Sequence, residues 1–538
     1  MGLGGRAGGV DRGSAPAETQ PEPAKVRRTS PARAFVALAM MLSGAGGLVV
    51  AANAGSPANA EVVGGNVPVN AGAASLADIS AHNSPTLARN PVDGANLAIA
   101  NRIDLPVFSC ALHLSYDGGA TWAQTPLPVP PGEEPKCFAP DVAFGADGTL
   151  YLAFLTLQGT GNLPNAVWVS NSRDGGRTLS GPTRVLGPLS FQVRLAADPS
   201  VAGRLYLAWV QAKATATLAF PDDGYPIEFT RSDDGGATWG EPVQVNDPSR
   251  RRVLAPSLAV GPKDQLFTLY LDVGDDKLDY AGGHEGKGGE PYRGTWSLVV
   301  ATSIDQGRKW TETTVEAKAV PSERFVVFLP PAPSLAVDRE RGRVYVGFNE
   351  GRSGDPDVRV WSSRDGGGTW EEPVRVNDTA ERDATSQYRP KLSVAPNGRL
   401  DVIYYDRRSD RRDVMNEVSL QSSFDAGRSF TPSLRLTDKP FDSRLGFGAE
   451  RGLPDLGSRL GLVSTDDHAL GVWSDTRVGT EASNKQDLVM GLARVSAPDL
   501  LAKPLELALR VGGGTLFIAG LALLVSWLRR RRRPVSIG

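Results

Sequence analysis

Acidic residues and arginines occur together at three places in the second half of the chain. The pairs are Glu350 with Arg352, Asp406 with Arg407, and Asp475 with Arg477. Carboxylates can exchange protons with a substrate, and guanidinium groups bind anions through charge-assisted hydrogen bonds. If these residues converge, they suit an acidic ligand and acid–base chemistry on it. Their repetition has a second interpretation, in which each arginine pairs with its acid and holds a loop.

The segments that must position these pairs are short and rich in β-forming residues. One unit consists of four runs, at residues 332–337, 342–348, 357–363 and 372–376, separated by glycine, proline, asparagine and aspartate. Short apolar runs with such punctuation predict a four-stranded antiparallel meander. Each acid–arginine pair follows the second strand of such a unit.

An eight-residue phrase recurs six times, between the third and fourth runs of successive units. Its copies are SYDGGATW from Ser115, SRDGGRTL from Ser172, SDDGGATW from Ser232, SIDQGRKW from Ser303, SRDGGGTW from Ser363 and SFDAGRSF from Ser423. The aspartate can accept backbone N–H bonds in a tight turn, and the glycine two residues later can adopt a positive φ. The final large apolar residue can anchor the turn between sheets. We call these segments the aspartate turns and predict that they are structural.

The repetition of a four-stranded unit about every 60 residues predicts the fold. It favours an all-β protein, a β-propeller of four-stranded antiparallel blades over residues 61–495. A seventh unit, at residues 460–465, 468–474 and 486–495, lacks a fourth strand and an aspartate turn. A strand within Glu61–Ile79 would complete it and close the ring, which removes exposed sheet edges. Seven blades are therefore favoured, with six blades plus an irregular segment as the alternative.

A meander of this kind sorts its loops onto two faces. The 1→2 turns share one face with the aspartate turns, and the 2→3 loops share the other with the connections between blades. The three acid–arginine pairs lie on the second face, together with Arg389 from a blade connection. Carboxylates and arginines that converge around a central funnel would form a binding site there.

The phrase Ser-x-Asp-x-Gly-x-Thr-Trp resembles the Asp-box, or bacterial neuraminidase repeat, of sialidase-like propellers over roughly residues 80–495. This resemblance implies a retaining exo-α-sialidase-type glycoside hydrolase acting on sialylated or related glycans. Sialidases use a tyrosine nucleophile assisted by a glutamate, an aspartic acid, and arginines that grip the substrate carboxylate. By resemblance, Tyr405 is the nucleophile, Glu350 its base, and Asp406 or Asp475 the acid. The arginines available for the carboxylate are Arg352, Arg389, Arg407 and Arg477.

The alternative function is a non-catalytic propeller that binds a glycan or a surface protein. The family's first arginine stands two residues before the proline that opens a blade, whereas Arg389 stands directly before Pro390. The repetition of the acid–arginine pairs also favours the structural interpretation. Release of a fluorogenic sialoside would separate the two functions.

The two ends of the chain predict export and a membrane anchor. Residues 1–60 combine a basic leader, the apolar run Ala34–Val50 and small-residue cleavage sites, which is typical of a secretory signal. Residues 496–510 are expected to be a linker. Val511–Leu528 lacks charges and is long enough for a transmembrane helix, and the basic tail 529–538 would lie in the cytoplasm. The propeller would then lie outside the cytoplasm, attached to the cell membrane or released by C-terminal processing.

Charge and cysteine content narrow the possible ligands. The chain carries a formal charge of −2, residues 1–60 carry +3 and residues 504–538 carry +5, which leaves −10 for the body. An acidic body without a basic stripe argues against nucleic acid as a partner. Cys110 and Cys137 are the two cysteines, and an even pair in an exported protein predicts a disulfide.

The sequence predicts no cofactor. The histidines, His82, His113, His284 and His468, are scattered, and none belongs to a zinc motif. No phosphate-binding lysine loop or dinucleotide-binding glycine motif is present. We therefore expect no metal and no organic cofactor, and a glycan or protein ligand instead.

Overall fold

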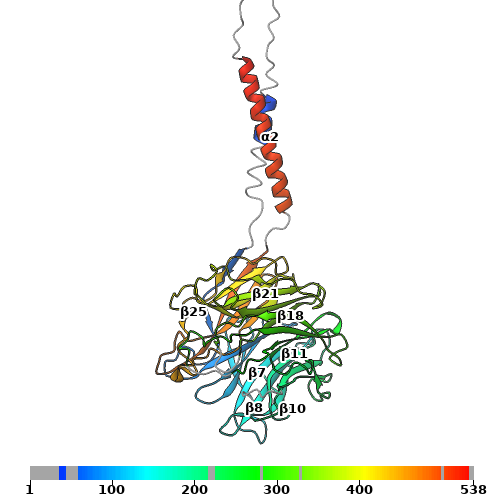
Figure 1. The fold of residues 1–538 in the computed structure, drawn as a ribbon, viewed down its shortest axis with the longest axis vertical. Helices are drawn as coiled ribbons and strands as arrows, with labels where there is room; N and C mark the ends of the chain where they lie inside the picture. The colour runs from blue at the N-terminus through cyan, green and yellow to red at the C-terminus, as the bar shows by residue number, and fades with distance from the viewer. Residues whose placement is uncertain are drawn as a thin grey trace, which may run out of the picture. The chain divides into compact units, whose positions relative to one another are not determined.

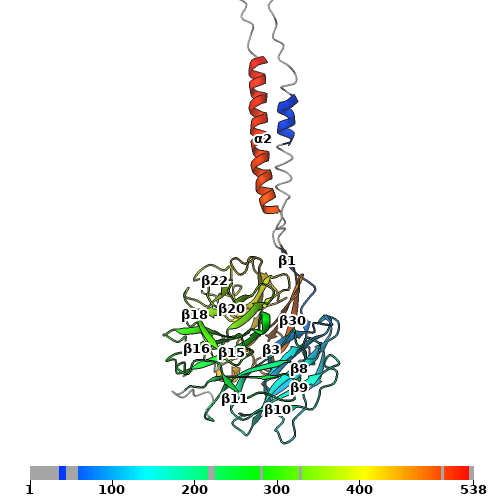
Figure 2. The same cartoon turned by 90° about the vertical axis from the view of Figure 1, so that its right-hand side faces the viewer.

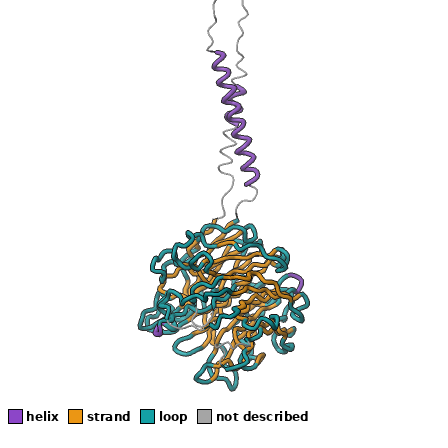
Figure 3. The backbone as a smooth tube through the Cα atoms, in the orientation of Figure 1, coloured by secondary structure: helices purple, strands orange, loops and turns teal. Residues whose placement is uncertain are grey.

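The computed structural model describes residues 35–43, 59–215, 224–278, 283–325, 330–497 and 502–531. The chain divides into two compact units, with Ala58–Pro498 in one and Met1–Pro57 and Asp499–Gly538 in the other. The described part of the first unit consists of strands and loops. Its helical content there is two single turns, η1 (Pro262–Asp264) and η2 (Ala449–Arg451) (Figure 3).

Seven antiparallel sheets make up this unit, and consecutive strands pair within each sheet (Figure 1). The first three blades are β3 (His82–Arg89), β4 (Leu97–Ile103), β5 (Ser109–Ser115) and β6 (Ala123–Pro126); β7 (Cys137–Phe144), β8 (Leu150–Gln158), β9 (Leu163–Ser172) and β10 (Thr183–Leu186); and β11 (Ser190–Ala197), β12 (Leu205–Gln211), β13 (Ile227–Ser232) and β14 (Val243–Gln244). The fourth is β15 (Val253–Val260), β16 (Leu266–Asp272), β17 (Trp296–Ser303) and β18 (Thr311–Ala319).

The remaining blades follow the same order. The fifth is β19 (Ser334–Asp338), β20 (Arg343–Glu350), β21 (Asp357–Ser363) and β22 (Val374–Arg375). The sixth is β23 (Gln387–Val394), β24 (Leu400–Asp406), β25 (Met415–Ser423) and β26 (Leu434–Arg435), with β27 (Phe441–Asp442) also paired to β25. The seventh contains β28 (Gly461–Ser464), β29 (His468–Asp475) and β30 (Asp487–Ser496).

The N-terminal end of the propeller closes the ring. β1 (Asn59–Val62) pairs with β30 from Asn59 opposite Ser496 to Val62 opposite Ala493, and β2 (Val67–Pro68) pairs with the same strand. Figure 2 shows the blue strand β1 beside the orange strand β30. The predicted fold is therefore confirmed with seven blades, and the six-bladed alternative is wrong. β1 begins two residues inside the segment predicted as leader.

Apolar side chains between neighbouring sheets form the core. Large aromatic residues on the second and third strands are fully buried, among them Trp296, Trp361 and Trp473. Burial of one such side chain contributes roughly 1.5–3 kcal/mol through the hydrophobic effect. The inner strands consequently read as nearly continuous apolar runs, as β8 and β12 do.

The aspartate turns have the predicted hydrogen bonds. In the first turn, Asp117 accepts a hydrogen bond from the backbone N–H of Thr121 at 2.9 Å and another from the Ser115 hydroxyl at 2.8 Å. The Ser115 hydroxyl in turn accepts the N–H of Gly119 at 2.8 Å. These bonds lower the pKa of Asp117 to about 2, with the Thr121 hydroxyl as the largest cause. The backbone N–H of Gly118 also binds Ala95 in the 1→2 turn, so the two turns share a face as predicted.

The first strands of the seven blades surround the central axis. Each of β3, β7, β11, β15, β19 and β23 contacts the first strand of the next blade, and β28 contacts β3. Five of the seven carry a β-bulge at a residue with positive φ. These residues are Ser84, Ala139, Gln192, Ala255 and Arg389. A bulge re-aims the side chains that follow it, and here it sets which residues face the channel.

The described residues of the smaller unit form two helical segments, residues 35–43 and α2 (Ala502–Arg531). None of the helices that the structure describes is both long enough and apolar enough to cross a membrane. The predicted transmembrane anchor at Val511–Leu528 falls within α2 and is therefore not supported.

Candidate functional site

The three predicted acids lie at the ends of second strands and are enclosed by protein. Asp406 is fully buried and accepts hydrogen bonds from Arg408 Nε at 2.6 Å and the Ser419 hydroxyl at 2.7 Å. Asp475 is 1% exposed and pairs with Arg477 at 2.6 Å. Each of these acids is thus held by the arginine two residues later. For Asp406 that partner is Arg408 rather than the adjacent Arg407.

Glu350 has the same arrangement on β20. It is fully buried, pairs with Arg352, and forms a second ion pair with Arg359 at 2.7 Å. Arg352 also binds Glu316 at 2.7 Å, so the carboxylate and the guanidinium group of this pair each have a second partner. A carboxylate enclosed by two guanidinium groups is not placed to contact a substrate. These contacts favour the loop-holding interpretation of all three acid–arginine pairs.

Arg407 connects separate loops. Its side chain is 1% exposed. Its guanidinium donates to Gly286 O at 2.6 Å, Asp413 O at 2.6 Å, Asn416 Oδ1 at 2.8 Å and the Ser443 hydroxyl at 2.9 Å. The first of these contacts fixes the 2→3 loop of the fourth blade to the sixth. With its donors engaged in this way, Arg407 has no free edge for a substrate carboxylate.

Tyr405 is fully buried on β24. Its hydroxyl donates to Ser474 O and accepts from the Ser474 backbone N–H, both at 3.2 Å. Burial raises the pKa of Tyr405 above its usual range, which disfavours a nucleophilic phenolate. The structure brings Tyr405, Arg389 and Arg407 together around Tyr388, whose ring centre lies 5.4 Å from that of Tyr405.

Seven equivalent positions on the first strands form a ring around the central channel, and in the five bulged strands this position lies two residues after the residue with positive φ. Each position pairs with the matching residue of its blade's second strand, such as Asp141 with Ala153 and Lys391 with Ile403. In blade order the seven residues are Thr86, Asp141, Arg194, Ser257, Ser334, Lys391 and Gly461. The first six line one cavity of about 240 Å³. Gly461 has no side chain, and Arg459 lines the cavity from two residues upstream. We call this the channel ring.

Positive charge dominates the cavity. Four cationic side chains, from Arg194, Arg389, Lys391 and Arg459, line it together with one carboxylate, Asp141. Asp141 is already engaged, since it accepts the backbone N–H groups of Val142 and Leu195, each at 3.1 Å. None of the four cations forms an ion pair with any carboxylate that the structure describes. The cavity therefore has a formal excess of three positive charges in a propeller whose net charge is negative.

Several donors in the cavity have no acceptor among the described residues. Arg389 is 3% exposed; one of its Nη atoms donates to Phe325 O at 3.1 Å, and the other has no partner. One Nη of Arg459 donates to Pro140 O at 3.1 Å, whereas its Nε and its other Nη have no hydrogen-bond partner among the described residues. Arg194 donates through Nε to Pro256 O at 2.9 Å. The guanidinium groups of Arg389 and Arg459 therefore keep donors that no described residue accepts.

The electrostatics agree with this geometry. Burial, followed by the charges of neighbouring arginines, lowers the pKa of Lys391 to about 8 and that of Arg459 to about 9. Burial also lowers the pKa of Arg194. The charge of Arg194 acts against protonation of both Lys391 and Arg459, and a bound anion would offset this repulsion.

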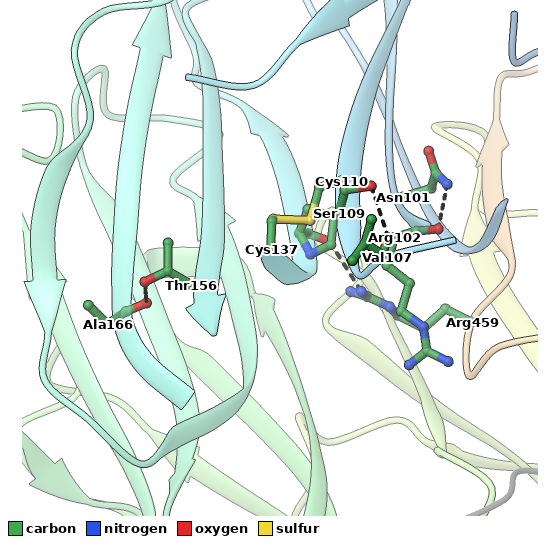
Figure 4. The surroundings of a disulfide bond; sticks show 10 residues. Asn101, Arg102, Val107, Ser109, Cys110, Cys137, Thr156, Ala166 and Arg459 are labelled. Carbon is green, nitrogen blue, oxygen red and sulfur yellow. Dashed lines mark hydrogen bonds between the residues drawn. A yellow bond between two sulfur atoms is a disulfide. The ribbon is translucent and has the colours of Figure 1, made fainter. Parts of the chain in front are cut away.

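The disulfide lies beside this site and joins two blades. Cys110 on β5 and Cys137 on β7 are bonded, with their Cα atoms 5.4 Å apart. Figure 4 shows Arg102 and Arg459 next to it. Arg102 is held by Asp104 at 2.9 Å and stacks on Phe138, 4.7 Å from the ring centre. The disulfide thus links the third strand of the first blade to the first strand of the second.

Sequence reasoning did not identify Arg194, Lys391 or Arg459. Alignment of the first strands would have revealed charged residues at one register of otherwise apolar segments, APDVAF, VRLAA and RPKLSV. Within the described residues, no group of three histidine, cysteine, aspartate or glutamate side chains is placed to hold a metal ion.

Comparisons with known proteins give only distant likenesses. No family model and no curated protein matches the chain. A solved α-L-arabinanase of Penicillium chrysogenum with bound arabinobiose is 17% identical, covers 68% of this chain and 98% of its own, and has a TM-score of 0.43. A Hadza microbial sialidase is 15% identical over 74% and 73% of the two chains, with a TM-score of 0.41. A polysaccharide lyase of the ulvan lyase type is 12% identical over 79% and 95%, with a TM-score of 0.45. At these identities the likeness does not extend to the chemistry.

Proposed function

We propose that this protein is an exported, non-catalytic propeller that binds an acidic glycan, with the acidic group of the sugar held in the channel ring. The observation that carries this proposal is the cavity lined by Arg194, Arg389, Lys391 and Arg459 without a pairing carboxylate. Like charges gathered around one small cavity repel one another, and a bound anion offsets that repulsion. One anion about 4 Å from a guanidinium gains roughly 4 kcal/mol at an effective dielectric constant of about 20.

The cavity limits what can enter. Its volume of about 240 Å³ suits one acidic group with a few neighbouring atoms and is too small for an oligosaccharide. The rest of a glycan would therefore lie outside the channel. The resemblance of the six aspartate turns to those of sialidase-like propellers supports a carbohydrate as the class of ligand.

Export is part of the proposal. The apolar segment near the N-terminus is typical of a secretory signal, and the Cys110–Cys137 disulfide suits an oxidising compartment. A ligand outside the cytoplasm agrees with a glycan rather than a metabolite.

The environment of the predicted catalytic residues favours binding over hydrolysis. Glu350, Asp406 and Asp475 are enclosed and paired with arginines, and the hydroxyl of Tyr405 is bonded to the backbone of Ser474. A general acid must reach the substrate, which an enclosed carboxyl group held by an arginine does not do.

A sialidase-type hydrolase remains the second candidate. Its support is that Tyr405, Arg389 and Arg407 lie around one aromatic cluster near the channel. In that case Tyr405→Phe would abolish release of a fluorogenic sialoside by the full-length protein. Absence of release by the unsubstituted protein would remove this candidate.

A glycan array tests the binding function. The full-length protein should bind glycans with terminal carboxylates or sulfates and leave neutral glycans unbound. Arg194→Ala and Arg459→Ala should each weaken binding, whereas Arg411→Ala, at an exposed position, should not. Equal binding of neutral and acidic glycans would refute the proposal.

A further inference from the structure

Lys391 occupies the sixth position of the channel ring. It lies on β23 opposite Ile403, and the preceding bulge at Arg389 directs it towards the axis. Its side chain is partly exposed and lines the cavity. An amine in this position is within reach of a ligand in the channel.

The amine has no partner in its surroundings. Lys391 forms neither a hydrogen bond nor an ion pair with any residue that the structure describes. The charged groups that act on it are Arg194 and Arg459, which repel a proton, and Asp141, which attracts one. A structural lysine normally donates to carbonyl oxygens, as buried Lys485 does to Gly72 O at 2.7 Å and Ser75 O at 2.8 Å.

These surroundings make the amine nucleophilic. Burial, the largest cause, lowers the pKa of Lys391 to about 8, and the neighbouring arginines lower it further in the same direction. At pH 8 about half of the Lys391 side chains carry a free lone pair, against roughly one in 250 for an exposed lysine. A lysine desolvated beside other cations is a known way to activate an amine for attack on a carbonyl group.

We propose that Lys391 is a covalent site, at which its amine condenses with the carbonyl group of a small carboxylic acid held by Arg194 and Arg459. The Nζ lone pair attacks the carbonyl carbon and forms a C–N bond. The two N–H protons of the attacking amine pass to the carbonyl oxygen, which leaves as water, and the nitrogen lone pair forms the C=N bond of a neutral imine. The step consumes no oxidant or reductant and is reversible. It rests on the proposed anion site and specifies a second ligand of that site, a free acid with an adjacent carbonyl such as the open-chain form of a keto-acid sugar that is not linked to a glycan.

The charges around the cavity support binding of the acid before its condensation with Lys391. A bound carboxylate and Asp141 together offset the charges of Arg194 and Arg459, so the acid is held electrostatically. Burial of the amine, which the ligand does not relieve, continues to favour its neutral form. The arginines therefore position the acid, and Lys391 provides the nucleophile.

Reductive trapping tests this site in the full-length protein. The protein is incubated with pyruvate at pH 8, reduced with cyanoborohydride, digested and mapped by mass spectrometry. Lys391 should be modified at least about tenfold more than exposed Lys318 and Lys439, because its amine is neutral at this pH. The preference should shrink as the pH approaches 10, where the exposed amines also lose their protons.

Matched controls separate the covalent site from general reactivity. Acetone, which has the carbonyl but no carboxylate, should label Lys391 about tenfold less than pyruvate does. Arg459→Ala should lower labelling by pyruvate about tenfold, because a charge-assisted hydrogen bond is lost. Arg411→Ala should leave labelling by pyruvate unchanged. Lys391→Arg keeps a positive charge in the channel ring and should remove the adduct from the peptide that contains position 391.

The two proposals can fail separately. Calorimetric titration of the Lys391→Arg variant with pyruvate reports binding alone, because that variant cannot form the imine. Heat of binding to this variant, without an adduct at Lys391 of the unsubstituted protein, would overturn the covalent site and leave the anion site standing. Absence of both would overturn both, and equal labelling by acetone and pyruvate would overturn the role of the arginines.

Discussion

Arg407 shows how a residue of the expected type can have a different role. Its guanidinium joins Gly286 of the fourth blade to Asp413, Asn416 and Ser443 of the sixth. Arg407→Ala should lower the free energy of unfolding by about 3–5 kcal/mol, because buried acceptors lose their donor. Urea denaturation measures this, with exposed Arg411→Ala as the control. A loss below about 1 kcal/mol would show that Arg407 is not a structural clamp.

Two buried histidines give the propeller a predictable pH dependence. Burial lowers the pKa of His82 to about 4 and that of His113 to about 3, and both contact Asn101. The unfolded chain binds these protons near pH 6.5, so their contribution to stability is complete above that pH and is lost as the pH falls. Each histidine should lower the free energy of unfolding by about 1.4 kcal/mol for every unit that the pH falls between about 6 and 4.5.

Denaturation midpoints measured from pH 7.5 to 4.5 check this slope. The double variant His82→Asn, His113→Asn should flatten the dependence, even if it is less stable at pH 7.5. An unchanged slope in the double variant would assign the acid sensitivity to other groups.

Residue types alone could predict the acid–arginine pairs but not their partners. The sequence places Asp406 next to Arg407, whereas the strand alternates its side chains, so that Arg408 returns to the side of Asp406. Likewise, the sequence indicates Tyr405 as a polar aromatic residue, and only packing shows that Ser474 covers its hydroxyl.

The aspartate turn is the element whose mechanics were most predictable, because all of its bonds are local. Trp239 ends one such turn, donates to Gly236 O at 3.1 Å and packs against the core while remaining partly exposed. Trp239→Ala should lower the free energy of unfolding by about 2–4 kcal/mol, less than for a fully buried aromatic residue. Chemical denaturation measures the loss, and Trp239→Phe should restore most of it. No difference between the alanine and phenylalanine variants would contradict the anchoring role.

The channel ring could not be predicted by simple alternation along the first strands. A β-bulge adds one residue to these strands, and side chains beyond it change the face on which they lie. The bulged residue at Arg389 has φ +57°, which is uncommon for a residue other than glycine, and nothing in the local sequence besides Pro390 indicates it.

At the scale of the whole molecule, the period of the repeats was sufficient to predict the propeller. Seven first strands contact one another in a closed ring, and the N-terminal strand β1 completes the last blade. The charge of the central cavity follows from this closure, because Arg194, Lys391 and Arg459 come from three different blades and are distant in the sequence. Such a convergence is a property of the ring and of no single repeat.

Binding of one acid and of its uncharged ester tests the central claim most directly. N-acetylneuraminic acid and its methyl ester differ by one negative charge, and both can be titrated into the full-length protein by calorimetry at low salt. The acid should bind at least about tenfold more tightly than the ester, because at least one charge-assisted bond worth about 1.5–3 kcal/mol is lost. Arg194→Ala and Arg459→Ala should each reduce that difference. Equal affinities for the acid and the ester, unchanged by either substitution, would contradict an anion site in the channel ring.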